Sequence, residues 1–356
     1  MKLIFDAHLD LSLCAIDYNR DLRRELDEIR EEEKGLNDLG GRGAGVVCFP
    51  EMRRGGIGLC VATLLGGCMK PGAAASGWNS PEIAWGQTQG QLAWYHAMEE
   101  LGELEKIDNQ ASLRRAVERW RKGRTDGSIG YVLSLEGADS IRTPSHLEQS
   151  WEQGLRALGP AHYGLGRYAP GHDQKGPLPG QGRELLREMD RLGMILDASH
   201  LCDEAFHDAL DLYTGPVWAS HSNCRAIVDD PRQISDEQII RLIDRGAVIG
   251  GALDAWMMVT GWQRGITTPR EAGLRLEHLL DHTDHICQLA GNADHAGIGS
   301  DLDGAFGMEQ TPQDVQSISA LQHLGDLLEK RGYASEDIDK ILHGNFIRFL
   351  AKSLPA

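Results

Sequence analysis

The sequence predicts an α/β protein that folds as one (β/α)8 barrel, and three features of the chain support this fold class. Short apolar segments alternate repeatedly with longer amphipathic segments, the order typical of parallel strands joined by helices. Five of the apolar segments lead directly to a histidine or an acidic residue. The chain has 356 residues, a length that suits one elaborated barrel domain or two smaller domains.

The expected strands are apolar segments with the length of a buried strand. Two short runs, 45–49 and 58–63, are merged into one interrupted strand. In chain order the strands cover residues 3–7, 45–49 with 58–63, 129–135, 155–161, 194–198, 217–220, 247–251 and 296–300. Eight parallel strands match a (β/α)8 barrel, in which functional groups lie at the C-terminal ends of the strands.

The expected helices are amphipathic segments, several of which begin with a capping residue. Ser235 is followed three residues later by Gln238, a capping-box pattern. The predicted helices cover residues 17–33, 81–105, 112–122, 144–153, 182–192, 203–212, 235–245, 269–290, 312–331 and 335–352. No linker, repeat or low-complexity tract divides the chain, so residues 1–356 are predicted to form one domain.

Two loops are longer than a simple connection requires. Residues 66–80 are rich in glycine and alanine, and residues 164–182 are dense in turn-forming residues. Long loops in compact domains are usually functional or disordered. Because the second loop follows His162 at a strand end, we expect it to act as a lid over the site.

Polar side chains at the strand ends form the candidate site. Asp6, His8 and Asp10 alternate along the first strand, so they are expected to share one face. The later strands contribute Glu136, Asp197 with His200, His221 and Asp301. Side chains from five strands meet at one point only around a closed ring, so we prefer the barrel to a doubly wound open sheet. Imidazole nitrogens and carboxylate oxygens are ligands that suit zinc.

Composition restricts the partners of this chain. The formal net charge of -17 argues against binding to nucleic acid or to an anionic membrane surface, because both interactions rely on lysine and arginine. No segment has the roughly 20 consecutive apolar residues of a membrane span, and no signal peptide precedes the first strand. The seven cysteines include no CxxC pair, which favours a reducing compartment. We therefore expect a cytoplasmic protein that acts on a small molecule.

Five motifs together resemble the renal or membrane dipeptidases, zinc metallopeptidases with an amidohydrolase-like barrel. The motifs occur in the order found in that family and span nearly the whole chain. They are Asp6-Ala7-His8-Leu9-Asp10, Ser134-Leu135-Glu136-Gly137, Leu196-Asp197-Ala198-Ser199-His200, Ser220-His221-Ser222-Asn223 and Gly299-Ser300-Asp301-Leu302-Asp303-Gly304. Each motif alone is a weak indication of this family. Five motifs in register with the predicted strands together indicate the family specifically.

The resemblance implies a centre with two Zn²⁺ ions. By motif position, one ion is held by His8, Asp10 and Asp301, the other by His200 and His221, and Glu136 bridges both. A hydroxide between the ions would attack the peptide carbonyl, and Asp301 would pass a proton to the leaving amine. His162 would donate to the developing oxyanion. Arg232 would grip the carboxylate of the substrate through its forked guanidinium.

The activity that the resemblance implies is hydrolysis of dipeptides, including those with a C-terminal D-residue, by an enzyme that forms a homodimer. Residues 254–262 carry an acid and two tryptophans where the family has a plainer apolar and aromatic stretch, so the substrate is less constrained than the metal chemistry. Two alternatives stay open. One is hydrolysis of another small amide such as an N-acyl amino acid, and the other is a metal-binding barrel without catalysis.

Several individual residues have competing interpretations. Arg232 could instead pair with Asp229 or Asp230, and Arg225 is a rival clamp for an anion. Asp303 could replace Asp301 but is expected to orient its loop. We expect Asp6 to steer a ligand imidazole, and we expect His172 to be a solvated loop residue.

Overall fold

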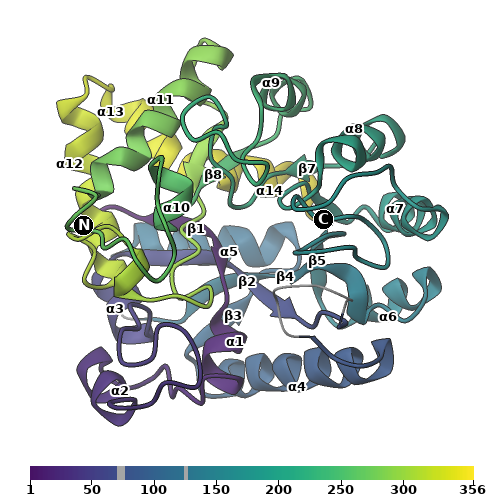
Figure 1. Cartoon of the computed structure of the whole chain (residues 1–356), viewed down its shortest axis with the longest axis horizontal. Helices are drawn as coiled ribbons and strands as arrows, with labels where there is room; N and C mark the ends of the chain where they lie inside the picture. The colour runs from purple at the N-terminus through teal and green to yellow at the C-terminus, as the bar shows by residue number, and fades with distance from the viewer. Residues whose placement is uncertain (70–76, 124–126) are drawn as a thin grey trace.

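A ring of parallel strands forms the centre of the molecule, and helices surround it (Figure 1). The computed structural model describes residues 1–69, 77–123 and 127–356. The ring strands are β1 (Ile4–Leu9), β2 (Ile57–Leu65), β4 (Ile129–Glu136), β5 (Leu155–Gly159), β6 (Ile195–Asp197), β7 (Val217–Trp218), β8 (Ile249–Gly251) and β9 (Ala296–Ile298). They pair in the order β7-β6-β5-β4-β2-β1-β9-β8, and a short strand, β3 (Leu104–Lys106), pairs with the start of β4.

The two ends of this strand order also meet. Ala219, directly after β7, forms a parallel bridge with Ile249 of β8. The Ser222 N–H donates to the Gly250 carbonyl at 2.7 Å. These contacts close the ring, so the predicted barrel is confirmed and the open doubly wound sheet is wrong.

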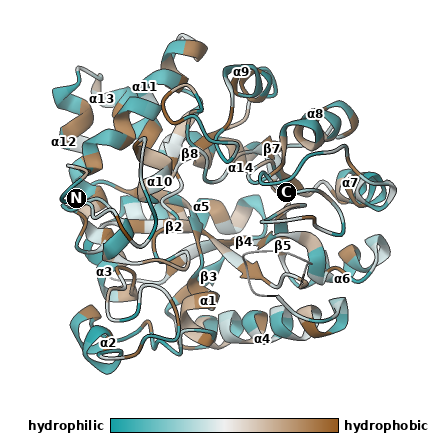
Figure 2. Ribbon diagram, in the orientation of Figure 1, coloured by the Kyte–Doolittle hydropathy of each residue, from teal (hydrophilic) through white to brown (hydrophobic). Residues whose placement is uncertain are grey.

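The helices lie mainly where the amphipathic pattern predicts them. In Figure 2 the outer helices alternate between hydrophilic and hydrophobic residues along their length. The Ser235 side chain accepts the Gln238 N–H at 3.3 Å, and the Gln238 side chain accepts the Ser235 N–H at 2.8 Å, which confirms the capping box. The helices are α1 (Leu11–Ile16), α2 (Leu26–Glu32), α3 (Phe49–Arg54), α4 (Pro81–Glu100), α5 (Gln110–Arg121), α6 (Leu147–Glu152), α7 (Gly180–Leu192), α8 (Asp203–Leu212), α9 (Asp236–Asp244), α10 (Ala255–Met258), α11 (Leu279–Ala290), α12 (His323–Lys330), α13 (Ser335–Asp339) and α14 (Asn345–Ser353).

Several predicted elements are wrong in part: the helices predicted over 269–290 and 312–331 contain α11 and α12, which begin only at Leu279 and His323, and two other elements differ more. Residues 45–49 are not a strand, because the N–H groups of Val46 and Val47 donate to the Asp303 carboxylate instead of to a neighbouring strand. Phe49 then begins α3, whose first turn contains a proline, a favoured position for that residue. The predicted helix over 17–33 is also shorter, since α2 covers only Leu26–Glu32 and Asn19 has a φ of 54°.

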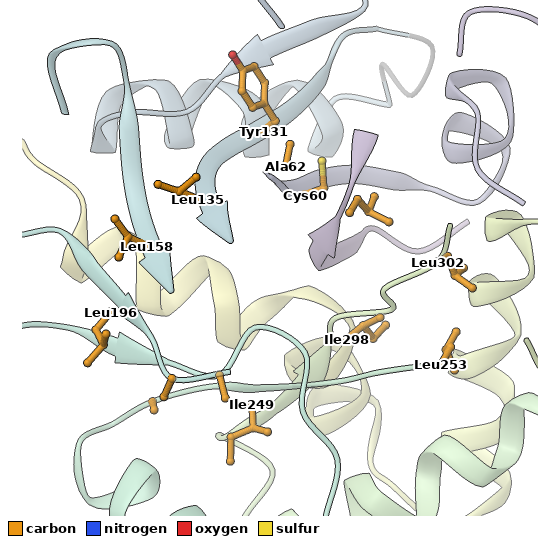
Figure 3. Packing of buried hydrophobic residues seen from close by; sticks show 14 of the residues in the cluster. Cys60, Ala62, Tyr131, Leu135, Leu158, Leu196, Ile249, Leu253, Ile298 and Leu302 are labelled. Atoms are coloured by element: carbon orange, nitrogen blue, oxygen red, sulfur yellow. The ribbon is translucent and has the colours of Figure 1, made fainter. Parts of the chain in front are cut away.

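Apolar side chains fill both sides of the barrel wall. Leu135, Leu158 and Leu196 are register partners on β4, β5 and β6, and Figure 3 shows them within the cluster between strands and helices. A second cluster includes Val132, which lies four residues before Glu136 on β4 and therefore faces the same way. This inner cluster, completed by side chains of α5 and α14, supports the strand ends that carry the site.

The two long loops differ in what the structure describes. Part of the 66–80 loop, residues 70–76, lies outside the described residues. The 164–182 loop is described throughout, and Gly171 forms a bridge with Leu201, next to His200, so this loop packs at the strand ends.

Among the described helices, none is both long and apolar enough for a membrane span. The single domain over residues 1–356 and the cytoplasmic location stay predictions.

A buried ion network joins the segment before β2 to the loop after β9. The Asp303 carboxylate accepts the N–H groups of Val46 and Val47 at 2.8 and 2.9 Å and a guanidinium N–H of Arg20 at 3.3 Å. Arg20 also donates to both carboxylate oxygens of Glu33, at 2.8 and 3.0 Å. Asp303 therefore orients its loop, as predicted, and does not replace Asp301 at the site.

We expect Asp303→Ala to lower the free energy of unfolding by about 3–5 kcal/mol, because it removes one of the two carboxylate partners of Arg20 and leaves two buried N–H groups without their acceptor. Urea unfolding curves measure this loss. The control is Asp27→Ala, whose side chain is 96% exposed, with an expected change within about 0.5 kcal/mol. Equal unfolding midpoints for the two variants would contradict the prediction.

Candidate metal centre

Glu136, the last residue of β4, lies at the centre of the predicted ligands. Its Oε1 atom is 3.1 Å from His200 Nε2, 3.3 Å from His221 Nε2 and 3.6 Å from His8 Nε2. The Nε2 atoms of His200 and His221 are 2.9 Å apart. One carboxylate oxygen thus faces three imidazoles that come from three different strand ends.

His8, in β1, links this group to the two remaining acids. Its Nε2 atom is 3.7 Å from Asp10 Oδ1 and 3.8 Å from Asp301 Oδ1. The same nitrogen is buried and has no hydrogen-bond partner among the described residues. A buried polar atom without a partner is unfavourable, so this nitrogen is oriented to bind a group that the chain itself does not supply.

The six predicted ligands therefore come together, in three overlapping sets. His8, Asp10 and Asp301 form one set whose ligand atoms lie within 4.8 Å of one another, as the sequence predicts. The other two sets are His8 with Glu136 and His221, and Glu136 with His162 and His200. The structure adds His162 to the candidate ligands. The exact division of ligands between two ions stays a prediction.

Burial controls the charge of these groups. Desolvation, reinforced by the neighbouring acids, raises the pKa values of Glu136 and Asp301 well above their usual range, and desolvation raises the pKa of Asp10 to about 6. Desolvation also lowers the pKa of His8 to about 3 and that of His200 well below its usual range. The imidazoles are therefore neutral, the form that binds metals.

The residues present fit a pair of cations. The buried carboxylates of Asp10 and Glu136 and the partly exposed carboxylate of Asp301 repel one another unless protons or cations neutralise them, and the neutral imidazoles supply lone pairs at the same place. Imidazole and carboxylate donors suit Zn²⁺. The identity of the metal stays a prediction.

Two candidate ligands have an unusual backbone conformation. His200 and Asp301 have φ angles of 64° and 59°, values that are uncommon for residues other than glycine. The structure near Asp301 is fixed by Asp6, whose carboxylate accepts the Ser300 N–H at 2.8 Å and the Ser300 hydroxyl at 2.5 Å. Strained backbone held by its surroundings is frequent at functional sites.

The predicted role of Asp6 as the partner of an imidazole is wrong. Its hydrogen bonds go to Ser300 and to the His8 backbone N–H. The prediction assumed strict alternation along β1, but the pairing with β2 shifts register between Asp6 and Leu9. Such an irregularity re-aims side chains, and here Asp6 ties β1 to the residue before Asp301.

Arg232 is buried next to the candidate ligands. Its Nη2 group donates to the His221 carbonyl at 2.7 Å and lies 3.2 Å from His200 Nε2. No carboxylate of the described residues forms an ion pair with this guanidinium, since Asp230 accepts only the Arg232 backbone N–H, at 2.8 Å. The rival residue, Arg225, pairs instead with both oxygens of Asp203 at 2.9 and 2.7 Å.

His172, predicted as a solvated loop residue, is buried at 6% exposure, so that prediction is wrong. Its Nδ1 atom is 3.1 Å from His200 Nδ1, and its ring meets the Tyr163 ring edge-on at 4.7 Å. If His200 binds a metal through Nε2, its Nδ1 carries the proton and donates to His172. Sequence spacing gave no indication of this contact, because it depends on the course of the 164–182 loop.

A cavity of about 250 Å³ opens over the candidate ligands. Its lining includes Asp10, Glu136, His162, His200 and Asp301, together with Arg232. The lining also contains residues that the site prediction did not include, among them Tyr163, Trp256, Arg264 and Gln310. The sequence drew attention to residues 254–262, and Arg264 lies just beyond that segment.

Comparison with known proteins identifies the family. A family model described as membrane dipeptidase, peptidase family M19, matches residues 2–353. The chain belongs to this family. A solved structure of the metallopeptidase named dipeptidase AC is 26% identical, covers 100% of this chain and 99% of its own, and has a TM-score of 0.76. The family and the barrel fold implied by the five sequence motifs are thereby confirmed.

Two curated relatives of the dipeptidase family match part of the chain. An uncharacterized dipeptidase of Schizosaccharomyces pombe is 29% identical over 226 residues, which are 62% of this chain and 52% of that protein. The dipeptidase tcpJ of Claviceps purpurea is 30% identical over 229 residues, 63% of this chain and 51% of that protein. The chain thus spans about half the length of these two curated relatives.

We expect His172→Phe to weaken zinc binding by about 10–100-fold, the usual effect of removing the outer hydrogen-bond partner of a metal-binding histidine. Competition with a chelating dye measures the affinity of each ion. His323→Phe, at an exposed histidine of α12, is the control and should bind zinc as the wild type does. Unchanged affinity in His172→Phe would show that His172 only fills space.

Proposed function

We propose that this protein is a metal-dependent dipeptidase that hydrolyses the peptide bond of dipeptides, including those with a C-terminal D-residue. The observation that carries the proposal is the combination of the six clustered ligands, four of which line the cavity, with the buried guanidinium of Arg232 in the same lining. The guanidinium donates to the His221 carbonyl but has no ion-pair partner among the described residues, and a buried charge that is not paired is unfavourable. An anionic substrate would supply that partner.

The proposed ions are two Zn²⁺, held by His8, Asp10, Glu136, His200, His221 and Asp301. When bound, such ions polarise a carbonyl oxygen and lower the pKa of a coordinated water from about 15.7 to about 7. The inner cluster of the barrel and the closed strand ring hold the protein ligands on rigid backbone, which favours precise positioning.

The chain contributes three further functions in this proposal. Arg232 binds the C-terminal carboxylate through two parallel N–H donors and so places the scissile bond at the strand ends. His162, with its side chain 25% exposed and its Nε2 3.9 Å from Glu136 Oε2, donates to the carbonyl oxygen as negative charge develops. Asp301 carries a proton from the attacking water to the leaving amine.

A structural relative supports the choice of substrate. The crystal structure of a metallopeptidase from Rhodobacter sphaeroides contains a phosphinate mimic of the dipeptide L-Ala-D-Ala. That protein is 24% identical to this chain, covers 99% of it and 100% of its own length, and has a TM-score of 0.75. We extend the dipeptide specificity, with acceptance of a C-terminal D-residue, to this chain as part of the proposal. The homodimer implied by the family stays a prediction.

Removal of the metal should abolish hydrolysis of both L-Ala-L-Ala and L-Ala-D-Ala, because the proposed mechanism depends on the metal ions to lower the pKa of the attacking water. Amino acid release is measured before and after dialysis against a chelator, and Zn²⁺ is then added back with the metal content measured in parallel. Turnover that persists in protein shown to be free of metal would refute the proposed function.

Asp301→Asn should lower kcat by about 10²–10⁴-fold, the usual contribution of general acid–base catalysis. Since Asp301 is also a candidate ligand, metal content is measured on the same sample. Asp326→Asn, at an exposed acid of α12, is the matched control with unchanged kcat. Full activity in metal-loaded Asp301→Asn would assign the proton transfer to another group.

Arg232→Met should raise KM for dipeptides and lower kcat/KM by about 10²-fold, which corresponds to about 2.7 kcal/mol for the lost charge-assisted hydrogen bonds. A dipeptide amide, which lacks the carboxylate, should be a poor substrate for the wild type. Its kcat/KM should fall little further in the Arg232→Met variant. Arg225→Met removes an arginine that is paired with Asp203 and serves as control. An equal loss of kcat/KM on the dipeptide and on the amide would contradict binding of the substrate carboxylate by Arg232.

A further inference from the structure

A second guanidinium, that of Arg264, lines the cavity over the candidate metal ligands. Arg264 lies in the segment after α10, and its side chain is 51% exposed. The guanidinium carbon is 4.7 Å above the ring of Trp256, a cation–π distance. Its Nη2 group donates to the Tyr163 hydroxyl at 3.3 Å. These contacts fix the Arg264 guanidinium at the cavity wall and leave it accessible from the cavity.

Asp254, the acid nearest to Arg264, does not occupy all of the N–H donors of the Arg264 guanidinium. Asp254 lies 3.5 Å from Nη2 of Arg264, a long contact. The Asp254 carboxylate accepts shorter hydrogen bonds from Trp256 Nε1 at 2.6 Å and from Gln310 Nε2 at 2.8 Å. Among the described residues, no hydrogen bond is donated by Nε or Nη1 of Arg264. The guanidinium therefore has donors available for an anion in the cavity.

The balance of charge around the cavity also favours a second anion. Asp10, Glu136 and Asp301 are occupied by the cations in the proposed function, and Asp254 is buried among its own donors. Arg232 binds one carboxylate of the substrate. Arg264 then remains as the cavity-facing cation whose charge is only partly matched, and a partly exposed arginine binds carboxylates well through its fork.

Arg232 and Arg264 line the same cavity, and a chain of contacts through His200 and Tyr163 joins them. Arg232 Nη2 is 3.2 Å from His200 Nε2, and the His200 ring is 5.5 Å from the Tyr163 ring. The hydroxyl of that tyrosine is the acceptor for Arg264. A single substrate residue bound to Arg232 through its α-carboxylate can therefore present its side chain toward Arg264.

We propose that Arg264 selects dipeptides whose C-terminal residue is acidic. The α-carboxylate of that residue would bind Arg232, and the side-chain carboxylate of Asp or Glu would bind Arg264. This inference rests on the proposed dipeptidase function and narrows its substrate class. Asp254 and Trp256 act as positioning residues, because they fix Arg264 and do not contact the substrate carboxylate.

The test compares substrates that differ only in charge. The zinc-loaded wild type should hydrolyse Ala-Glu with a kcat/KM at least about 10-fold above that for Ala-Gln, the difference expected for one charge-assisted hydrogen-bonded pair. Both enantiomers of the C-terminal residue are assayed, and the better one is used. The pair Glu-Ala and Gln-Ala, with the charge on the N-terminal residue, should show a ratio near 1.

Variants then assign the selectivity to Arg264. Arg264→Met should bring the Ala-Glu to Ala-Gln ratio close to 1, and Arg264→Glu should favour Ala-Lys over Ala-Glu. Arg270→Met, at an exposed arginine in the same segment, should keep the wild-type ratio. Since each ratio is measured within one enzyme, a partial loss of folded protein does not affect it.

Three results would overturn the inference. They are a wild-type ratio near 1, a ratio that survives in Arg264→Met, and a preference for Glu-Ala instead of Ala-Glu. Each of these requires that some dipeptide is hydrolysed, so each leaves the proposed function intact. Failure of the zinc-loaded wild type on every dipeptide would instead overturn the proposed function, and this inference with it.

Discussion

The clustering of three desolvated carboxylates and several imidazoles at one end of a closed barrel is the constraint on which the rest of the structure depends. Desolvation makes charged carboxylates unstable there and keeps imidazoles neutral. A cation pair resolves both effects at once, because it neutralises the acids and uses the imidazole lone pairs. The ring of parallel strands delivers these side chains from five strand ends to one point, which an open sheet would not do.

Much of this arrangement could be predicted from the sequence because it is encoded locally. The apolar segments define the strands, and Glu136 or His221 follows its strand directly in the chain. Features that depend on distant contacts could not be predicted in this way. Residues 45–49 have the composition of a strand, yet their N–H groups are taken by Asp303, which lies more than 250 residues later. His172 is buried only because its loop packs back on His200.

The register shift in β1 shows how a small irregularity changes the role of a residue. Uniform alternation would direct Asp6 and His8 to one face, but the pairing of β1 with β2 shifts register between Asp6 and Leu9. Asp6 consequently fixes Ser300, the residue before Asp301. A side chain that was expected to orient one ligand thus orients another, on a neighbouring strand. The positive φ of Asp301 is tolerated because this contact and the Asp303 network hold the loop on both sides.

Catalytic chemistry and substrate choice reside in different parts of the molecule. The candidate ligands lie at or just after strands that are supported by packed apolar layers, whereas Trp256 and Arg264 lie in the connection after β8. Because Trp256 and Arg264 are not among the core side chains of the described residues, these two residues can change without disturbing the packing that supports the metal centre. The buried acid Asp254 makes this wall stiffer than an ordinary loop, since its carboxylate binds donors from Trp256 and Gln310 at once. A rigid wall keeps the Arg264 guanidinium in one place, which reduces the entropy lost when a substrate carboxylate binds.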